Sequence, residues 1–514
     1  MKHSRISQIT FLTAALASTQ SLPALAAGDN APPQTFTAAH EEVDLSPDRS
    51  LRASTNLQRD EQAKEELGYS LGMQAYTYGL PSMRFEEFRY GLNLLALAHA
   101  RRELNTFSQS SHDGAQFNEL VHVRSLSTPS LKLGVTPNND TLYSSCFYQL
   151  KNEPLVLTIP DIQDRYYSVQ IVDGNLSNVA YLGTRATDSQ PGKYALVGPD
   201  WTGDLPADIT RIDVPTNEGF FALRILTDGG KDTEEVTTLQ KQFEARPLSA
   251  ELNGTVVQEW QDFPRPATEG ELPDYARIVD FAQRNPPRNA AGRAIWDSFK
   301  HLGLSLDEPF KPEHIDPAIK RGMQRAIAAT RDLIAWKVKY RGHKSKSMWN
   351  VDLVGGRYGQ DYLARAEGAI QGLVVHSAAE GMYFHTYHDG AGEALNGQHQ
   401  YTLTFSPDHL PPVDAFWSLT GYTDDYNLVE NEFQRYSIGD RTGGLSYNKD
   451  GSLTLHIQSS MPESGGNNWL PVPDGEMFRL NLRMYMPKPG VLTKESIEHY
   501  VPPVVKTTHS MAAK

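Results

Sequence analysis

The sequence predicts an α+β protein with two β-sandwich or barrel-like domains, which helical segments precede and link. Two regions, residues 107–226 and 400–514, contain the β-branched and aromatic runs that are typical of strands, with turn residues between them. Helical periodicity dominates residues 60–100 and 235–345. The chain has 514 residues, which is enough for two or three domains with their own cores.

Residues 1–26 have the pattern of a secretory signal peptide. Lys2 and Arg5 form a positive start, and a short apolar run and a small-residue cleavage site follow. The apolar run is too short to span a bilayer, and no later run reaches the roughly 18 apolar residues that a membrane span needs. We therefore expect a periplasmic or secreted protein with a flexible leader over residues 27–60 and no membrane span.

The chain is acidic, with a formal net charge of −14. Such a surface would be repelled by nucleic acid phosphates and by an anionic membrane surface, so we expect neither as a partner. A small polar molecule is the expected partner, and the oligomeric state is left open. The single cysteine, Cys146, excludes an intrachain disulfide and a thiolate metal site, and we expect a packed, inert thiol.

Residues 60–100 are expected to form two helices that Pro81 separates, because proline lacks the N–H group that a helix interior needs. The same segment contains Gly68-Tyr69-Ser70-Leu71-Gly72, a formal match to the nucleophile elbow G-x-S-x-G. That motif works at a corner between a strand and a helix, and no strand precedes it here. We therefore expect a helix and no catalytic serine.

The first β region contains several strand-like runs. In one of them Tyr167, Val169 and Ile171 fall on one face, whereas Tyr166 and Gln170 fall on the other. The first face suits a core, and the second carries hydrogen-bonding groups of the kind that line a pocket. The predicted strands are Leu155–Ile159, Tyr166–Val172, Val179–Leu182, Tyr194–Val197 and Phe220–Leu226.

Residues 236–375 are expected to form a mainly helical linker. A helix should begin at Asp316-Pro317, because aspartate caps a helix N-terminus and proline fits its first position. Residues 249–290 contain many prolines and acidic residues, so we expect them to cross the surface. A further helix is expected from about Gln360 to His376.

Residues 376–514 are expected to form the second β domain. Its last predicted strand alternates apolar residues with Arg479, Asn481, Arg483 and Tyr485, so that it has one apolar and one polar face. The predicted strands are Tyr401–Phe405, Ala415–Gly421, Leu453–Gln458 and Phe478–Tyr485.

Several long strings of the sequence carry a family resemblance. Within residues 61–235 they are Thr136-Pro137-Asn138-Asn139-Asp140-Thr141-Leu142-Tyr143, Asp164–Gln170, Gly183–Thr187 and Gly192–Tyr194. Within residues 376–514 they are Leu410–Pro412, Ala415–Ser418, Tyr436–Arg441 and Asn468–Pro471. The first set resembles the domain-of-unknown-function family 1254 and the second resembles family 1214, two families usually found together. The resemblance implies two β domains in an exported or envelope-associated bacterial protein, and it implies no activity.

The polar strand faces and the family strings predict a ligand site in a cleft between the two β domains. Arg185, Arg441 and Arg483 present planar forks that suit a carboxylate or phosphate, so a small polar ligand with an anionic group or sugar rings is expected. The alternative for each arginine is an ion pair with a local acid, such as Asp440 beside Arg441. The other candidate ligand-binding residues are Asn138, Asn139, Tyr166, Gln170, Tyr181, Trp417, Tyr436 and Trp469.

Two other functions stay open at this point, and the sequence leaves uncertain whether the protein is an enzyme. The first is an envelope hydrolase, in which Asp140 or Asp173 would act as acid or base beside a tyrosine or arginine. Turn capping explains Asp173 equally well. The second is a structural or assembly module, which would present an exposed apolar patch in place of a pocket.

A histidine cluster, His385, His388 and His399, lies near Asp389 and has ligand types that could bind zinc. Because Asp389-Gly390 indicates a turn, a solvated loop with chance histidines is the preferred interpretation, and no metal is favoured. The sequence has no Walker loop, dinucleotide fingerprint or haem-attachment spacing, so it gives no sign of a nucleotide or haem cofactor. The cofactor is otherwise unknown.

Overall fold

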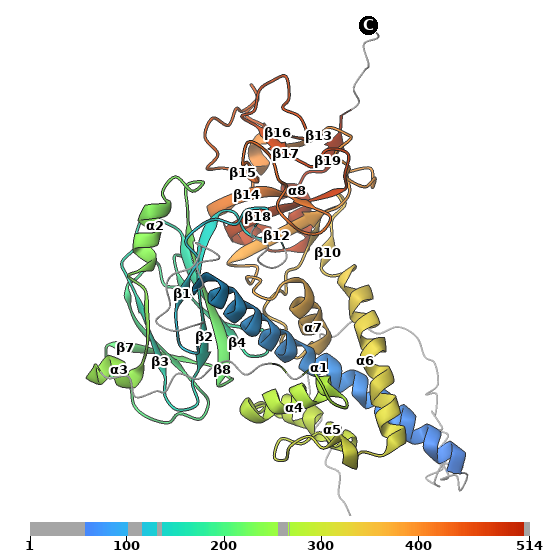
Figure 1. Cartoon of the computed structure of the whole chain (residues 1–514). Helices are drawn as coiled ribbons and strands as arrows, with labels where there is room; N and C mark the ends of the chain where they lie inside the picture. Colours follow the sequence, from blue (N-terminus) through green and yellow to red (C-terminus); the bar gives the residue numbers. More distant parts are fainter. Residues whose placement is uncertain (1–56, 101–115, 131–135, 255–265, 267, 508–514) are drawn as a thin grey trace, which may run out of the picture. The chain divides into compact units, whose positions relative to one another are not determined.

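The computed structural model describes residues 57–100, 116–130, 136–254, 266 and 268–507 (Figure 1). The predicted signal peptide and most of the predicted leader lie outside these residues. Among the described helices, none combines the length and the apolar composition that a bilayer crossing requires.

The first β region forms two packed sheets. Their strands are β1 (Val121–His122), β2 (Thr141–Gln149), β3 (Leu155–Ile159), β4 (Tyr167–Asp173), β5 (Asn178–Gly183), β6 (Gly192–Val197), β7 (Ile209–Asp213), β8 (Glu218–Leu226) and β9 (Glu244–Pro247). One sheet has the order β1-β2-β8-β4-β5 and the other has the order β7-β6-β3-β9. Side chains such as Leu157, Val169 and Leu223 fill one core between them, which makes this region a sandwich that includes β9.

The strands predicted for this sandwich are confirmed to within two residues at each end. Tyr167, Val169 and Ile171 are in its core, as the alternation predicted, because successive side chains of a strand point to opposite faces. Cys146 is also in this core and is 1% exposed, as expected of a packed thiol. Burial raises the pKa of the Cys146 thiol well above its usual value, which keeps it protonated and unreactive.

The second β region forms another pair of sheets. Its strands are β10 (His343–Lys344), β11 (Asn350–Val351), β12 (Gly381–Thr386), β13 (Tyr401–Phe405), β14 (Val413–Thr423), β15 (Ser437–Gly439), β16 (Leu453–Gln458), β17 (Trp469–Pro471), β18 (Phe478–Pro487) and β19 (Val504–Lys506). The sheet orders are β10-β11-β12-β18-β14-β15 and β17-β16-β13-β19. Leu403, Leu455 and Leu482 lie in their shared core. Within the described residues none of the four sheets closes on itself, so both domains are sandwiches and not barrels.

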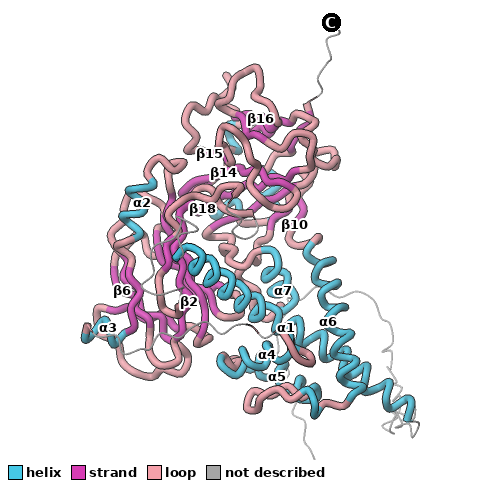
Figure 2. Tube along the Cα trace, in the orientation of Figure 1, coloured by secondary structure: helices cyan, strands magenta, loops and turns pink. Residues whose placement is uncertain are grey.

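The helices are α1 (Leu57–Ala100), α2 (Thr233–Gln240), α3 (Leu248–Asn253), α4 (Pro273–Arg284), α5 (Ala290–Phe299), α6 (Pro317–Val338), α7 (Tyr362–Gln371) and α8 (Lys494–Tyr500). Short 3₁₀ turns cover Lys300–Leu302, Pro312–His314, Pro407–His409 and Pro489–Val491. In the tube of Figure 2 the helices α4, α5 and α6 gather around α1, with which they share a core of their own. Residues of α1 also pack on the first sandwich, where Phe85 meets Phe147 edge to face.

The predicted break at Pro81 is wrong, because α1 continues through it from Leu57 to Ala100. Pro81 is buried, and its neighbours Leu80 and Met83 belong to the core that α1 shares with α4 and α6. The Ser82 hydroxyl adds a hydrogen bond to the Gly79 carbonyl in the same turn, at 2.7 Å. Tertiary packing therefore outweighs the hydrogen bond that proline cannot make.

The prediction that residues 249–290 cross the surface is wrong for α4. Tyr275, Ile278 and Phe281 recur at helical spacing and are at most 3% exposed. By contrast, the start of α6 is confirmed, since Asp316 accepts a hydrogen bond from the N–H of Ala318 at 2.8 Å.

The G-x-S-x-G string forms a close helix–helix contact. A Cβ on Gly68 would lie 2.2 Å from the Ile319 carbonyl oxygen of α6, so only glycine allows this approach. Across the contact, a Cβ on Gly322 would lie 2.0 Å from the Glu65 carbonyl oxygen of α1. Ser70 is exposed and donates to the Leu67 carbonyl of its own helix. The glycines of this motif therefore serve packing.

This contact predicts a large effect for one substitution and a small effect for another. Gly322→Ala should lower the free energy of unfolding by about 1–3 kcal/mol, because the helices must move apart to admit the methyl group. Ser70→Ala should change it by less than about 0.5 kcal/mol, since the side chain is exposed. Urea denaturation of both variants measures the difference, and a Gly322→Ala protein as stable as the wild type would contradict the contact.

Candidate functional site

The turn Pro137-Asn138-Asn139-Asp140 precedes β2 of the first sandwich and binds the second sandwich through side chains. The Asn138 side-chain oxygen accepts hydrogen bonds from the N–H groups of Asp140 (2.5 Å) and Thr141 (3.2 Å), which fixes the turn. The Asn138 side-chain nitrogen donates to the hydroxyl of Tyr485 in β18, at 2.5 Å. One asparagine thus shapes the turn and binds the other sandwich.

Asp140 accepts hydrogen bonds from two residues of the second sandwich. It is 3% exposed, and its two carboxylate oxygens accept from the Ser418 hydroxyl and from the Arg441 guanidinium, each at 2.7 Å. Arg441 also donates to the Thr227 carbonyl at 2.5 Å and lies 4.5 Å from the centre of the Phe416 ring. Both carboxylate oxygens of Asp140 therefore take part in interactions between the domains.

Arg483 binds the same turn from β18. Its guanidinium donates to the Thr420 hydroxyl (3.0 Å), the Tyr422 hydroxyl (2.7 Å) and the Thr136 carbonyl (3.0 Å). Tyr422 in turn donates to the Pro137 carbonyl at 2.8 Å. Arg483 is 2% exposed, so this bonding takes place away from bulk solvent.

Glu380 joins the sandwiches at a second place. It is 1% exposed and accepts hydrogen bonds from the Tyr166 hydroxyl, at 2.7 Å, and from the Arg185 guanidinium. The Tyr166 ring packs edge-on against Phe416 and Tyr485, at 5.5 and 5.6 Å between centroids. Burial, followed by the Glu380 charge, raises the pKa of Tyr166 well above its usual value, so its hydroxyl remains a donor.

Arg224 of β8 occupies the centre of the polar face of the first sandwich. It is 3% exposed and donates to the Gln170 side chain (2.7 Å), the Tyr143 hydroxyl (3.1 Å) and the His376 ring (2.7 Å). The Tyr181 ring lies 5.6 Å from the His376 ring, centroid to centroid. Burial, and then the Arg224 charge, lowers the pKa of His376 well below its usual value, so a neutral ring accepts the hydrogen bond.

The other predicted site residues lie elsewhere. Trp417 and Trp469 are at most 4% exposed, and the Trp417 ring packs in the core of the second sandwich. Tyr436 is half-buried just before β15. Asp173 accepts from two N–H groups of the turn after β4, and burial raises its pKa. Asn139 donates to a backbone carbonyl of the first sandwich. None of these five residues lines the cleft between the two sandwiches.

The histidines do not form a cluster of ligands. His385 is in β12, so the expectation of a solvated loop is wrong for this residue, and burial lowers its pKa to about 3. His388 and His399 follow in the loop before β13, where Asp389 caps the turn by accepting from two backbone N–H groups. Among the described residues, no three histidine, cysteine or acidic side chains come together as metal ligands.

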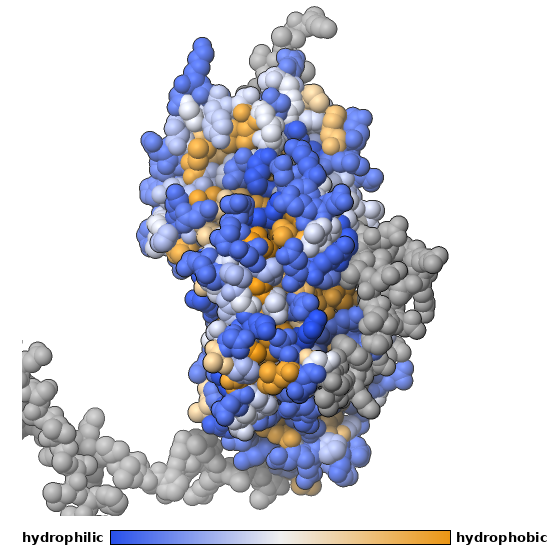
Figure 3. Space-filling model, turned by 90° about the vertical axis from the view of Figure 1, so that its left-hand side faces the viewer, coloured by the Kyte–Doolittle hydropathy of each residue, from blue (hydrophilic) through white to orange (hydrophobic). Residues whose placement is uncertain are grey.

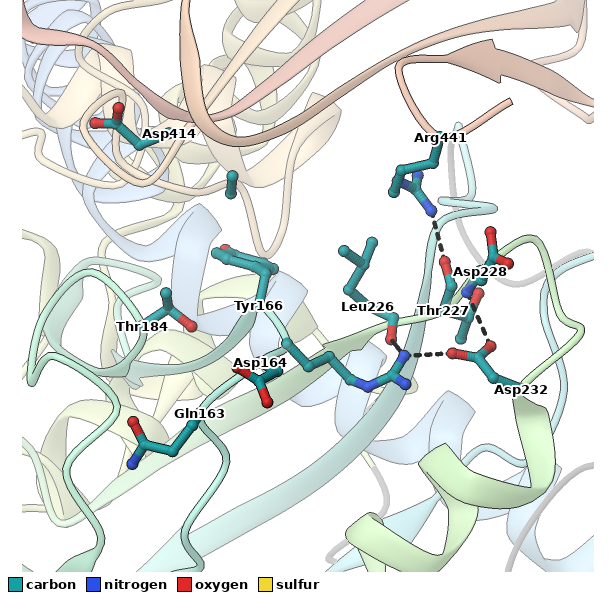
Figure 4. A pocket seen from close by; sticks show the side chains of 12 residues that line it. Gln163, Asp164, Tyr166, Thr184, Leu226, Thr227, Asp228, Asp232, Asp414 and Arg441 are labelled. Atoms are coloured by element: carbon teal, nitrogen blue, oxygen red, sulfur yellow. Dashed lines mark hydrogen bonds and ion pairs between the residues drawn. The ribbon is translucent and has the colours of Figure 1, made fainter. Parts of the chain in front are cut away.

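A cleft of about 400 Å³ opens between the two sandwiches (Figure 4). Thr227, Asp232 and Arg441 lie on one side in this view, with Gln163 and Thr184 on the other. Of the predicted ligand-binding residues, Tyr166 and Arg441 line it. The full lining is Gln163, Asp164, Arg165, Tyr166, Thr184, Leu226, Thr227, Asp228, Asp232, Asp414, Ala415 and Arg441.

The cleft is acidic, because four aspartates and two arginines line it. Arg165 pairs with Asp232 and Arg441 pairs with Asp140 outside the lining, so both cations are already neutralised. Asp164 and Asp414 are exposed, and no described cation lies within 4 Å of either carboxylate. The cleft therefore offers free hydrogen-bond acceptors.

Sequence reasoning missed Arg224, His376 and Glu380. Arg224 had a usable signal, since it is the one charged residue in the apolar run Phe220–Leu226, and a charge in a buried strand needs partners. His376 and Glu380 lie in the irregular segment between α7 and β12. The predicted helix extended to about His376, but α7 ends at Gln371, so helical periodicity gave no sign that these residues contact the first sandwich.

Comparison with known proteins agrees with the resemblance found in the sequence. Residues 117–247 match the family described as protein of unknown function (DUF1254). Residues 380–489 match the family described as protein of unknown function (DUF1214). Both matches lie in the expected order, and each falls on one of the two sandwiches. No protein with a curated description matches the chain.

Two solved structures are similar to this one. The crystal structure of the VPA0106 protein from Vibrio parahaemolyticus has a TM-score of 0.65 and 21% sequence identity, over 86% of this chain and 100% of that chain. An uncharacterized protein from Burkholderia cenocepacia has a TM-score of 0.38 and 12% identity, over 88% of this chain and 96% of that one. The first likeness shows a shared fold.

Proposed function

We propose that this chain, which carries a DUF1254 region followed by a DUF1214 region, binds a small polyhydroxylated, sugar-like molecule in the cleft of Figure 4. The observation that carries the proposal is the pair of free carboxylates, Asp164 from the first sandwich and Asp414 from the second. Carboxylates accept hydrogen bonds from hydroxyl groups, and the Thr184 hydroxyl and the edge of Tyr166 complete a mixed lining. A volume of about 400 Å³ suits a small molecule.

The acidic lining supports a neutral ligand over an anionic one. An anion in the cleft would face the free carboxylates of Asp164 and Asp414, and the two lining arginines already bind carboxylates. The sequence had predicted an anionic or sugar-like ligand, and the charge of the cleft favours the second of these. The signal-peptide pattern of residues 1–26 supports a periplasmic or secreted location for this binding.

Isothermal titration with a neutral sugar panel tests the proposal, with sugar phosphates and uronic acids as anionic comparators. At least one neutral sugar should bind, and Asp164→Ala and Asp414→Ala should each weaken its binding about 10- to 100-fold, the value of a hydrogen bond to a charged group. Asp408→Ala removes an exposed carboxylate of the second sandwich that does not line the cleft, so it should leave binding unchanged. Absence of binding across the panel, or an equal loss in Asp408→Ala, would contradict the proposal.

A second candidate, hydrolysis, draws support from Asp440. Partial burial raises the pKa of Asp440 to about 6 against the opposing charge of Arg441, which lies 3.9 Å away and lines the cleft. A carboxyl group that keeps its proton up to this pH can act as a general acid. Hydrolysis of glycan or ester substrates that Asp440→Asn abolishes would favour this candidate, and an Asp440→Asn protein with full activity would reject it.

An assembly role has less support on the face drawn in Figure 3. Apolar residues there lie in small separate groups among hydrophilic ones. A docking surface for another protein would be expected to form a contiguous apolar patch. For this face the ligand-binding proposal is therefore the better supported one.

A further inference from the structure

The polar face of β18 contains two buried guanidinium groups that form no ion pair with any described carboxylate. Arg479 and Arg483 are 6% and 2% exposed, and both lie on this face with Asn481 between them. The two guanidinium groups are close enough that Arg483 contributes to lowering the pKa of Arg479, after the larger effect of burial. Within the described part of the chain, no carboxylate lies within 4 Å of either group.

The paired arginines of the same interface show the contrast. Arg185 has Glu380 as its counter-charge, and Arg441 has Asp140. Arg479 and Arg483 instead have tyrosine and threonine hydroxyls and one backbone carbonyl, which are all uncharged. Neutral acceptors can satisfy N–H groups without compensating the charge, and the only carboxylate charge among the main influences on the pKa of Arg483 is that of Asp140, which lies beyond 4 Å. Burying a cation in that condition costs free energy.

Arg479 also has hydrogen-bonding capacity to spare. One of its nitrogens donates to the Tyr387 hydroxyl at 2.7 Å, and its guanidinium lies 4.7 Å from the centres of the Tyr387 and Tyr426 rings. Its Nε is buried and has no hydrogen-bond partner, and the same holds for the side-chain oxygen of Asn481. The Nε donor of Arg479 and the side-chain oxygen acceptor of Asn481 are therefore both without a partner, two residues apart on β18.

His385 adds a neutral polar group at the same place. It pairs with Asn481 across β12 and β18, so its side chain lies on the same face of the sheet. Its neutral ring has one N–H donor and adds no charge to the two guanidinium groups.

We propose that a small oxyanion that keeps a hydroxyl group, such as a phosphate or a hydroxycarboxylate, binds over Asn481 between Arg479 and Arg483. Its charged oxygens accept from the guanidinium groups, and its hydroxyl donates to the side-chain oxygen of Asn481. A water molecule would satisfy the leftover donor and acceptor but not the charge. This site shares no residue with the acidic cleft, so the experiments on sugar binding and on oxyanion binding test the two proposals independently.

Thermal unfolding of the full chain in phosphate-free chloride buffer, at constant ionic strength, tests the proposal. Phosphate and citrate should each raise the Tm, and above the Kd the rise should follow the logarithm of their concentration, whereas added chloride should not raise it. Arg479→Gln should weaken the apparent phosphate affinity at least tenfold. The matched control is Arg246→Gln, which removes an exposed arginine of the first sandwich and should leave the phosphate response unchanged.

Asn481→Asp keeps the test decisive if Arg479→Gln fails to fold. An aspartate at this position supplies the missing charge from within the chain. The Asn481→Asp protein should therefore have a higher Tm than the wild type without phosphate, and phosphate should no longer raise it. A wild-type Tm that phosphate and citrate leave unchanged, or an equal phosphate response in Arg479→Gln, would overturn the proposal.

Discussion

Replacing Asp140 with asparagine is expected to lower the free energy of unfolding by about 3 kcal/mol, near the low end for breaking a buried ion pair. The carboxylate is 3% exposed and binds both Arg441 and Ser418 of the second sandwich. Asparagine keeps the shape of the side chain but removes the negative charge that neutralises the Arg441 guanidinium. We expect a loss at the low end of that range because the Arg441 side chain is 24% exposed, so water solvates part of its charge.

A double-mutant cycle with Arg441→Gln measures this interaction by urea denaturation. The two single variants should each lose stability, and the double variant should lose much less than their sum. The control is Asp213→Asn, an exposed carboxylate that pairs with Arg211 on β7 and should change stability by less than about 0.5 kcal/mol. Additive losses from Asp140→Asn and Arg441→Gln would show that the pair does not act as a unit.

Acidification below pH 6.5 is expected to weaken the interface around His376. Burial, and then the charges of Arg224 and Arg185, hold the pKa of His376 well below its usual value of 6.5. The unfolded chain therefore binds a proton there that the folded protein does not. The stability from the neutral ring is complete above about pH 6.5 and falls by about 1.4 kcal/mol per pH unit below it, down to the lowered pKa.

His376→Gln isolates this effect, because a glutamine oxygen can still accept the hydrogen bond from Arg224 and does not titrate. Where the slope of unfolding free energy against pH is steepest below pH 6.5, it should be smaller in this variant by up to about 1.4 kcal/mol per pH unit. His301→Gln changes an exposed histidine and should leave the slope unchanged. His122 offers a second case in the first sandwich, since burial lowers its pKa to about 4. An unaltered slope in His376→Gln would refute the assignment.

The strands were predictable because their pattern is local. Tyr401–Phe405 and Leu453–Gln458 have the bounds that the sequence predicted, and a sandwich strand presents every second side chain to the core. The errors occurred where packing from distant segments outweighed a local signal. Pro81 stays inside α1 because its surroundings are buried, and α4 is buried although prolines and acidic residues surround it in sequence.

The amino-acid sequence alone was enough to find the two β regions, their likeness to two families and the Pro-Asn-Asn-Asp turn. It could not say which charges meet, because the partners are far apart along the chain. Arg441 is 301 residues from Asp140, and Glu380 is 214 residues from Tyr166. Folding pairs some arginines with carboxylates, whereas Arg224, Arg479 and Arg483 form no ion pair with a described carboxylate. An isolated strand exposes all these groups to water, where charge pairing contributes little to stability. The pairing affects the free energy of folding strongly only when the two sandwiches bury the groups together.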